Sequence, residues 1–220
     1  EMLYKLNGMF AFCIYDSNKK QLLLARDRTG VKPLYYYFDG DKFIFSSEIK
    51  SILCHKIVKK VDFEALAFYL MYGYTLEHSL FNGIKQLLPA SYIIFDLEKK
   101  TISGGKFWQL VEDRVQVGID EIELLLKDSV EKRAIADVPV GSYLSGGIDS
   151  SIITALSSPY IDEYHTFNVN FGEEVYSESK YAKMVSDHLG TIHHELTIEV
   201  ENVIKEIKNI VWHYDDPIAE

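Results

Sequence analysis

The sequence lacks the run of about 18 apolar residues that a membrane-spanning helix requires. It also has no basic segment followed by an apolar one, so we expect no secretion signal. Cysteine is rare: the 220 residues include only Cys13 and Cys54, too few for a disulfide framework. These absences favour a cytoplasmic protein that neither crosses nor contacts a membrane.

Positive charge is scarce and scattered. The chain has 23 lysines and arginines against 33 acidic residues, a net charge of -10, and no segment concentrates the basic ones. A nucleic-acid-binding face needs such a concentration to neutralise phosphates. We therefore expect small molecules, and no nucleic acid, as partners.

The first half has the alternation and turn signals of antiparallel β-hairpins. The predicted strands are 9–15 paired with 21–26, 34–38 paired with 42–46, and 91–96 paired with a strand from Thr101 onward. Asp39-Gly40-Asp41 is a tight-turn signal inside the second hairpin. Asp62 should cap a helix that begins at Phe63, continues to about Tyr72 and ends before Gly73.

The second half alternates helices with strands, which is typical of a parallel α/β sheet. The first predicted helix has apolar residues three and four positions apart, at Ile119, Ile122, Leu126, Val130 and Ala134. Strands are predicted at 138–144, 165–171 and 192–197, and helices at 150–157, 177–189 and 200–213. The predicted domains are an antiparallel α+β part over 1–108, a linker at 109–118 and a parallel α/β part over 119–220.

One loop in the second half has the composition of a phosphate-binding site. Residues 145–151, Ser-Gly-Gly-Ile-Asp-Ser-Ser, directly follow an apolar strand and open a helix. The glycines let the backbone approach an anion, and the amides at the helix start favour phosphate. The three serines add hydroxyl donors, and Asp149 can hold a Mg²⁺ that bridges phosphates. The plain alternative is a surface turn. The loop is not a Walker loop, because the Gly-Lys-Ser/Thr ending is missing.

This loop resembles the PP-loop of N-type ATP pyrophosphatases, which include GMP, NAD, argininosuccinate and asparagine synthetases. Three flanking segments are similar to the asparagine synthetase version, in the same order: Asp-Val-Pro-Val-Gly at 137–141, Thr-Phe-Asn-Val at 166–169 and His-Leu-Gly-Thr-Ile-His-His-Glu at 188–195. In the first half, residues 6–12, 26–36 and 46–50 resemble the later part of that family's class II glutaminase domain, an Ntn-type fold.

The resemblance implies a glutamine-hydrolysing asparagine synthetase that uses ATP, Mg²⁺, glutamine and aspartate. Ammonia from glutamine would attack a β-aspartyl-AMP intermediate, giving asparagine, AMP and pyrophosphate. The residues that the resemblance assigns to ATP are Leu144, Ser145, Gly146, Gly147, Asp149, Ser150, Ser151 and Val169. Asp149 would bind Mg²⁺ through the pyrophosphate, and Val169 would contact the adenine; a plain core valine is the alternative for Val169.

No catalytic residue of the glutaminase can be assigned. The family's cysteine nucleophile stands at the mature N-terminus, where this sequence has Glu1. Cys13, inside an apolar strand, and Cys54, near a helix end, are interpreted as structural. The sequence opens within a domain and stops at Glu220, before the family's second phosphate loop. We therefore expect an internal fragment that is inactive alone.

Several alternatives stay open at this stage. Relatives of this family amidate sugar acids for surface polysaccharide or close β-lactam rings, and a nucleotide sensor without chemistry is a third hypothesis. A homodimer is compatible with the sequence, which fixes no oligomeric state. His193 and His194 should point to opposite faces of a strand and not form a metal pair. Arg26-Asp27-Arg28 could be a fixed ion-pair loop or an ordinary surface loop.

Overall fold

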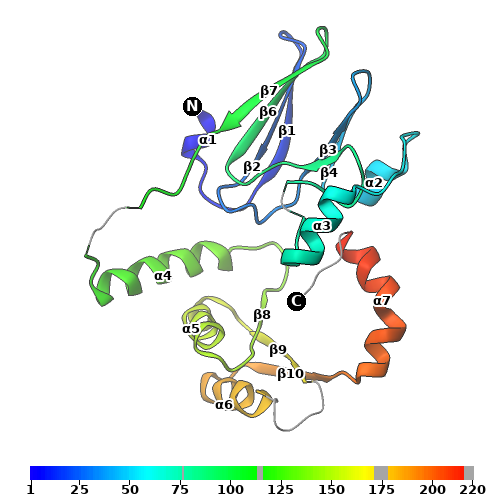
Figure 1. Cartoon of the computed structure of the whole chain (residues 1–220). Helices are drawn as coiled ribbons and strands as arrows, with labels where there is room; N and C mark the ends of the chain where they lie inside the picture. Colours follow the sequence, from blue (N-terminus) through cyan, green and yellow to red (C-terminus); the bar gives the residue numbers. More distant parts are fainter. Residues whose placement is uncertain (76, 113–115, 171–177, 216–220) are drawn as a thin grey trace. The chain divides into compact units, whose positions relative to one another are not determined.

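The computed structural model describes residues 1–75, 77–112, 116–170 and 178–215 (Figure 1). The chain forms two compact units, Glu1–Glu112 with Lys208–Glu220 and Asp113–Ile207. Each unit has its own sheets, and the two are described separately below. Among the helices that the structure describes, none has both the length and the apolar character needed to cross a membrane.

The first unit contains an antiparallel sheet of four strands in the order β1-β2-β6-β7. These strands are β1 (Ala11–Asp16), β2 (Gln21–Arg26), β6 (Ser91–Asp96) and β7 (Thr101–Lys106). The pairing of Cys13 with Leu24, and of Leu24 with Ile93, sets the register across the sheet. The predicted first and third hairpins are therefore confirmed.

A second antiparallel sheet has the order β4-β3-β5. Its strands are β3 (Tyr35–Phe38), β4 (Phe43–Ser46) and β5 (Ile84–Gln86). The hairpin β3–β4 around Gly40 was predicted, whereas the three-residue strand β5 was not. The helices of this unit are α1 (Met2–Lys5), α2 (Ile49–Leu53) and α3 (Phe63–Tyr72).

Helix α3 has the ends that its local sequence predicts. The Asp62 carboxylate accepts hydrogen bonds from the amides of Glu64 at 3.1 Å and Ala65 at 3.0 Å. Gly73 ends the helix with a φ of 79°, a left-handed conformation that glycine adopts without a Cβ penalty. Both ends depend on neighbours in sequence, and for that reason they were predictable.

The core of the first unit consists of three clusters on and between its two sheets. Tyr35, Tyr37, Ile49, Ile52 and Ile84 form one; Leu24, Leu34, Leu87 and Ile93 a second; Leu3, Ala25, Ala90 and Phe107 a third. Aromatic stacking joins the sheets: the rings of Phe43 on β4 and Phe95 on β6 are 4.3 Å apart and nearly parallel. Cys13 packs against the second cluster, as expected for a structural cysteine.

The second unit is built on a parallel sheet of three strands in the order β10-β9-β8. These are β8 (Gly141–Tyr143), β9 (His165–Asn170) and β10 (Ile192–Thr197). The helices are α4 (Ile119–Ala134), α5 (Ile148–Ser157), the 3-10 turn η1 (Ser158–Tyr160), α6 (Ser179–Leu189) and α7 (Val200–Tyr214). Helix α7 continues past Ile207, so its last residues cluster with the first unit.

Two predicted boundaries in the second unit were wrong. The strand predicted at 138–144 is paired only from Gly141, because Pro139 has no N–H to donate to the sheet. The helix predicted from Ser150 begins at Ile148, since Gly147 takes the extended cap conformation, with a ψ of 163°. Phe171 and Ser177, the predicted ends of a strand and a helix, lie outside the described residues.

Candidate functional site

The candidate site is the loop that joins β8 to α5. Leu144 follows β8 and is fully buried. Its N–H donates to the Phe167 carbonyl at 2.8 Å, which extends the parallel pairing by one residue. Residues 145–147 then turn the chain from the carboxyl end of β8 into α5. Ligands of open α/β sheets bind at this edge, beyond the carboxyl ends of the strands.

Gly146 gives the loop its shape. Its φ of +86° is one that residues with a Cβ adopt only with strain. A Cβ atom there would lie 2.5 Å from the backbone nitrogen of Ala182 and 2.6 Å from the Cβ of Tyr181. Both neighbours belong to the first turn of α6, so the loop backbone lies directly against that helix. Glycine is required at this position for conformation and for space.

The three serines of the loop form a connected group of hydroxyls. The hydroxyl oxygens of Ser145 and Ser150 are 3.0 Å apart. The Ser150 and Ser151 hydroxyls donate to the Gly147 carbonyl at 3.2 and 2.7 Å, and the Gly147 amide donates to the Ser145 hydroxyl at 3.3 Å. The sequence segment therefore folds into a compact polar turn with its hydroxyls gathered at the start of α5.

The amides at the start of α5 are suited to an anion. The cap residue Gly147 has no side chain, and no side-chain hydrogen bond caps this helix among the described residues. The first turn of an α-helix leaves its N–H groups without intrahelical partners, at the positive end of the dipole. Asp149 lies in this turn, and its side chain is exposed. Within the described residues no three His, Cys, Asp or Glu side chains gather as a metal site, so a cation here would take most of its ligands from elsewhere.

Val169 lies on β9, two residues beyond Phe167, and therefore at the same edge of the sheet as the loop. Val169 is 41% exposed in the part of the chain that the structure describes. Strand alternation places it on the face opposite Asn168. The sheet thus brings seven contiguous loop residues and Val169 to one edge.

Two residues at this site, Asn168 and Ser179, were not predicted from the sequence. The Asn168 amide nitrogen donates to the Leu144 carbonyl at 3.0 Å, and its oxygen accepts from the Ser179 hydroxyl at 2.7 Å. Both side chains are buried. In β9 the polar Thr166 and Asn168 alternate with the apolar Phe167 and Val169, and that alternation was the available signal.

The adjacent histidines have separate partners, as predicted. His193 Nδ1 lies 3.0 Å from the Thr166 hydroxyl, whereas His194 Nε2 lies 2.8 Å from His165 Nδ1. The His194 ring also stacks on Phe167. The two imidazoles therefore belong to different contact groups and do not share a ligand position.

The Arg26–Asp27 segment is a buried backbone clamp. The Arg26 guanidinium donates to the carbonyls of Gly30, Lys32 and Leu87 at 2.5, 2.7 and 2.7 Å. The Asp27 carboxylate accepts hydrogen bonds from the backbone amides of Phe10, Thr29, Val31 and Lys32, at 3.0 to 3.3 Å. Burial raises the pKa of Asp27, but the hydrogen bonds from these backbone amides outweigh the effect of burial and hold the pKa below its usual value. Neither predicted alternative, ion-pair loop or surface loop, describes these contacts.

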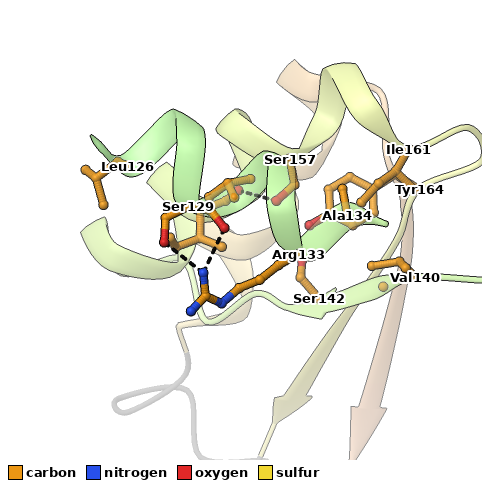
Figure 2. Close-up of a pocket in the computed structure, with 12 residues that line it drawn as sticks. Leu126, Ser129, Arg133, Ala134, Val140, Ser142, Ser157, Ile161 and Tyr164 are labelled. Carbon is orange, nitrogen blue, oxygen red and sulfur yellow. Dashed lines mark hydrogen bonds between the residues drawn. The ribbon is translucent and has the colours of Figure 1, made fainter. Parts of the chain in front are cut away.

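A cavity of about 470 Å³ lies away from the loop, beside the beginning of β8 (Figure 2). Its lining comes from α4, α5, η1–β9 and β8, and is mainly apolar. The Arg133 guanidinium at its side donates to the carbonyl and hydroxyl of Ser129, both at 2.8 Å. Because the cavity adjoins Gly141 and Ser142 at the opposite end of β8, it is separate from the candidate phosphate site.

Residues 1–108 match the glutamine amidotransferase domain family, and residues 121–220 match the asparagine synthase family. The two matches follow one another in a single chain. The chain belongs to the glutamine-hydrolysing asparagine synthetase family.

Curated members of the asparagine synthetase family align along the whole chain. It is 37% identical, over 98% of its length, to a putative glutamine-hydrolyzing asparagine synthetase 2 of Methanocaldococcus jannaschii, of which it covers 44%. It is 37% identical to asparagine synthetase 1 of Bacillus subtilis, covering 35% of that protein. It is 29% identical to asparagine synthetase B of Escherichia coli, covering 37%. The chain thus spans less than half the length of these relatives.

Proposed function

We propose that the full-length protein makes asparagine from aspartate, glutamine and ATP through a β-aspartyl-AMP intermediate, releasing AMP and pyrophosphate. The observation that carries this proposal is the loop at 145–151, with its open helix amides and gathered hydroxyls at the carboxyl edge of a parallel sheet. Membership of a family whose curated members are named asparagine synthetases supports it.

Each part of the loop has a proposed role toward ATP. The amides at the start of α5 and the hydroxyls of Ser145, Ser150 and Ser151 would bind the β and γ phosphates, which leave as pyrophosphate. Gly146 and Gly147 would let the backbone approach the phosphates. Leu144, buried immediately before the loop, would anchor it to the core. Val169, exposed at the same edge, would contact the adenine.

Asp149 is the proposed protein ligand of Mg²⁺. Magnesium in nucleotide sites commonly takes one or two carboxylates, with phosphate oxygens and water as the remaining ligands. A single exposed carboxylate beside the helix amides fits that pattern. The bound cation would neutralise charge on the departing pyrophosphate.

The first unit is proposed to be the later part of an Ntn-type glutaminase that supplies ammonia. Its paired antiparallel sheets are compatible with this fold. No nucleophile is assigned. Cys13 packs against the core, and burial raises the pKa of its thiol; Cys54 is exposed at the end of α2.

The acceptor is the least constrained part of the proposal. An amidase named chry2 from Gibberella zeae is 28% identical over 98% of this chain, so a similar sequence occurs in a protein with another name. Amidation of a different carboxylate, such as a sugar acid, or closure of a β-lactam ring, is therefore the second candidate function.

The deciding experiment is pyrophosphate release by the full-length protein with ATP, Mg²⁺ and glutamine, scanning aspartate against other carboxylates. We expect aspartate-dependent release with equimolar asparagine. Release with another carboxylate alone would keep the adenylation chemistry and replace the substrate. ATP binding without release, with every acceptor tested, would contradict the proposal and favour a nucleotide sensor.

A further inference from the structure

Asn168 connects the two backbone segments between which the phosphate loop is held. Its amide nitrogen donates to the carbonyl of Leu144, the residue immediately before the loop. Its amide oxygen accepts from the hydroxyl of Ser179, the first residue of α6. Leu144 is fully buried, and Asn168 and Ser179 are 6% and 7% exposed, so water does not compete for these bonds.

The partners settle how the amide is oriented. A carbonyl oxygen can only accept, so the Asn168 atom that faces Leu144 must be the nitrogen. The oxygen is then left for the Ser179 hydroxyl. An amide offers a donor and an acceptor on one planar group and stays neutral at every pH of interest, whereas a carboxyl group of the same size does so only when it is protonated. A carboxylate would direct negative charge at the Leu144 carbonyl.

These two bonds bear directly on loop geometry. β9 holds both backbone polar groups of Leu144, the N–H through the Phe167 carbonyl and the carbonyl through Asn168. Ser179 fixes the start of α6, and the first turn of that helix, at Tyr181 and Ala182, is the surface against which Gly146 packs. Asn168 therefore fixes the position of Leu144, where the loop begins, and of the start of α6, the helix against which the loop packs.

We propose that Asn168 is a positioning residue for the phosphate loop, with Ser179 as its partner. This rests on the proposed function of the loop. Asn168 does not touch ATP. It acts through Leu144 and α6 to hold the α5 amides and the serine hydroxyls in the positions from which they bind the leaving pyrophosphate. Its neighbour Val169 points to the other face of β9, so the adenine contact is independent of it.

The test compares Asn168→Asp with Asn168→Ala in the full-length protein, by steady-state pyrophosphate release between pH 6 and 8. A protonated aspartic acid can donate to Leu144 and accept from Ser179, whereas an ionised one cannot donate. Burial at this position, where Asn168 is 6% exposed, favours the protonated form.

We expect the alanine variant to lose roughly tenfold to hundredfold in kcat, with the KM for ATP within about threefold of wild type. The kcat of Asn168→Asp relative to wild type should rise about tenfold as the pH falls from 8 to 6, while that of Asn168→Ala stays flat. An alanine variant with wild-type kcat, or an aspartate variant whose relative kcat ignores pH, would overturn the proposal.

A replacement variant and the wild-type activity distinguish failure of the positioning role from failure of the proposed function. If circular dichroism shows that Asn168→Asp does not fold, Ser179→Ala replaces it: we expect about a threefold or greater fall in kcat at unchanged KM, and wild-type kcat would overturn the inference. If wild-type protein releases no pyrophosphate with any acceptor, the proposed function has failed. A positioning role that fails instead leaves wild-type release intact and the variants equal to it.

Discussion

Gly146 and Ala182 approach so closely that a Cβ atom on the glycine would lie 2.5 Å from the amide nitrogen of Ala182. This contact joins the phosphate loop to α6. The hydrogen bonds of Asn168 to Leu144 and Ser179 also connect the loop to α6. This helix therefore supports the site, although none of its residues belongs to the loop motif. The geometry of the loop is therefore a property of the whole parallel unit.

Gly146→Ala should abolish pyrophosphate release and destabilise the second unit by about 3 kcal/mol, because the clash with backbone adds to the strain of a positive φ. Urea unfolding and the pyrophosphate assay measure the two effects. Gly190→Ala is the matched control: Gly190 has a φ of +71° but nothing within 4 Å of its Cβ position. It should lose about 1 kcal/mol and keep its activity. Equal behaviour of both variants would refute the close contact.

Asp149→Asn should lower kcat for pyrophosphate release on the order of 100-fold, because the variant lacks the carboxylate proposed to bind Mg²⁺. The Mg²⁺ concentration needed for half-maximal activity should rise as well. Stability should change by less than about 1 kcal/mol, the value of one acid in an exposed first helical turn. Asp162→Asn, at an exposed acid outside the loop, is the control. A variant of Asp149 with unchanged Mg²⁺ dependence would exclude this residue as the ligand.

Asp62→Ala should destabilise the first unit by about 1 kcal/mol without changing ATP chemistry. The substitution leaves the Glu64 and Ala65 amides without their carboxylate acceptor. Thermal unfolding measures the loss, and Asp62→Ser should recover most of it since serine also caps helices. If the alanine variant unfolds like wild type, the cap contributes nothing to stability.

The sequence predicted the elements whose ends are decided locally. Asp62 and Gly73 bound α3 at the predicted residues, and turn signals placed most hairpins. It overextended the strand before the loop, because the apolar pattern of Val138 and Val140 concealed the missing donor of Pro139. The strand β5 was missed: three residues are too few to show a period.

For the site, a contiguous motif was enough to locate the loop but not what supports it. The hydrogen bond that Asn168 donates to Leu144 spans 24 residues, and the one that it accepts from Ser179 spans 11. Such pairs come together only after β8, β9 and α6 have packed. The same holds for Asp27, whose amide partner Phe10 is 17 residues away. Non-local partners of this kind leave little trace in a single sequence.

Asp27→Asn should destabilise the first unit by about 2 kcal/mol at neutral pH, because the neutral amide accepts the buried N–H groups more weakly than the carboxylate does. Urea unfolding at pH 7 measures the difference. Asp41→Asn, at an exposed acid in the β3–β4 turn, is the control and should stay near wild type. A small loss at Asp27 would mean that Arg26 and the surrounding backbone hold this segment without the charge.

The pH dependence of the Asp27→Asn effect tests its cause. Hydrogen bonds lower the pKa of Asp27 in the folded state, so the folded chain releases this proton more readily than the unfolded chain. The stabilisation is therefore complete above the unfolded-state pKa and is lost as the pH falls through the lower, folded-state pKa. The gap in unfolding free energy between wild type and Asp27→Asn should shrink in acid and stay constant from pH 6 to 8. If this difference in unfolding free energy widens in acid, the carboxyl group of Asp27 is protonated in the folded state. The hydrogen bonds from the Val31 and Lys32 amides would then need another explanation.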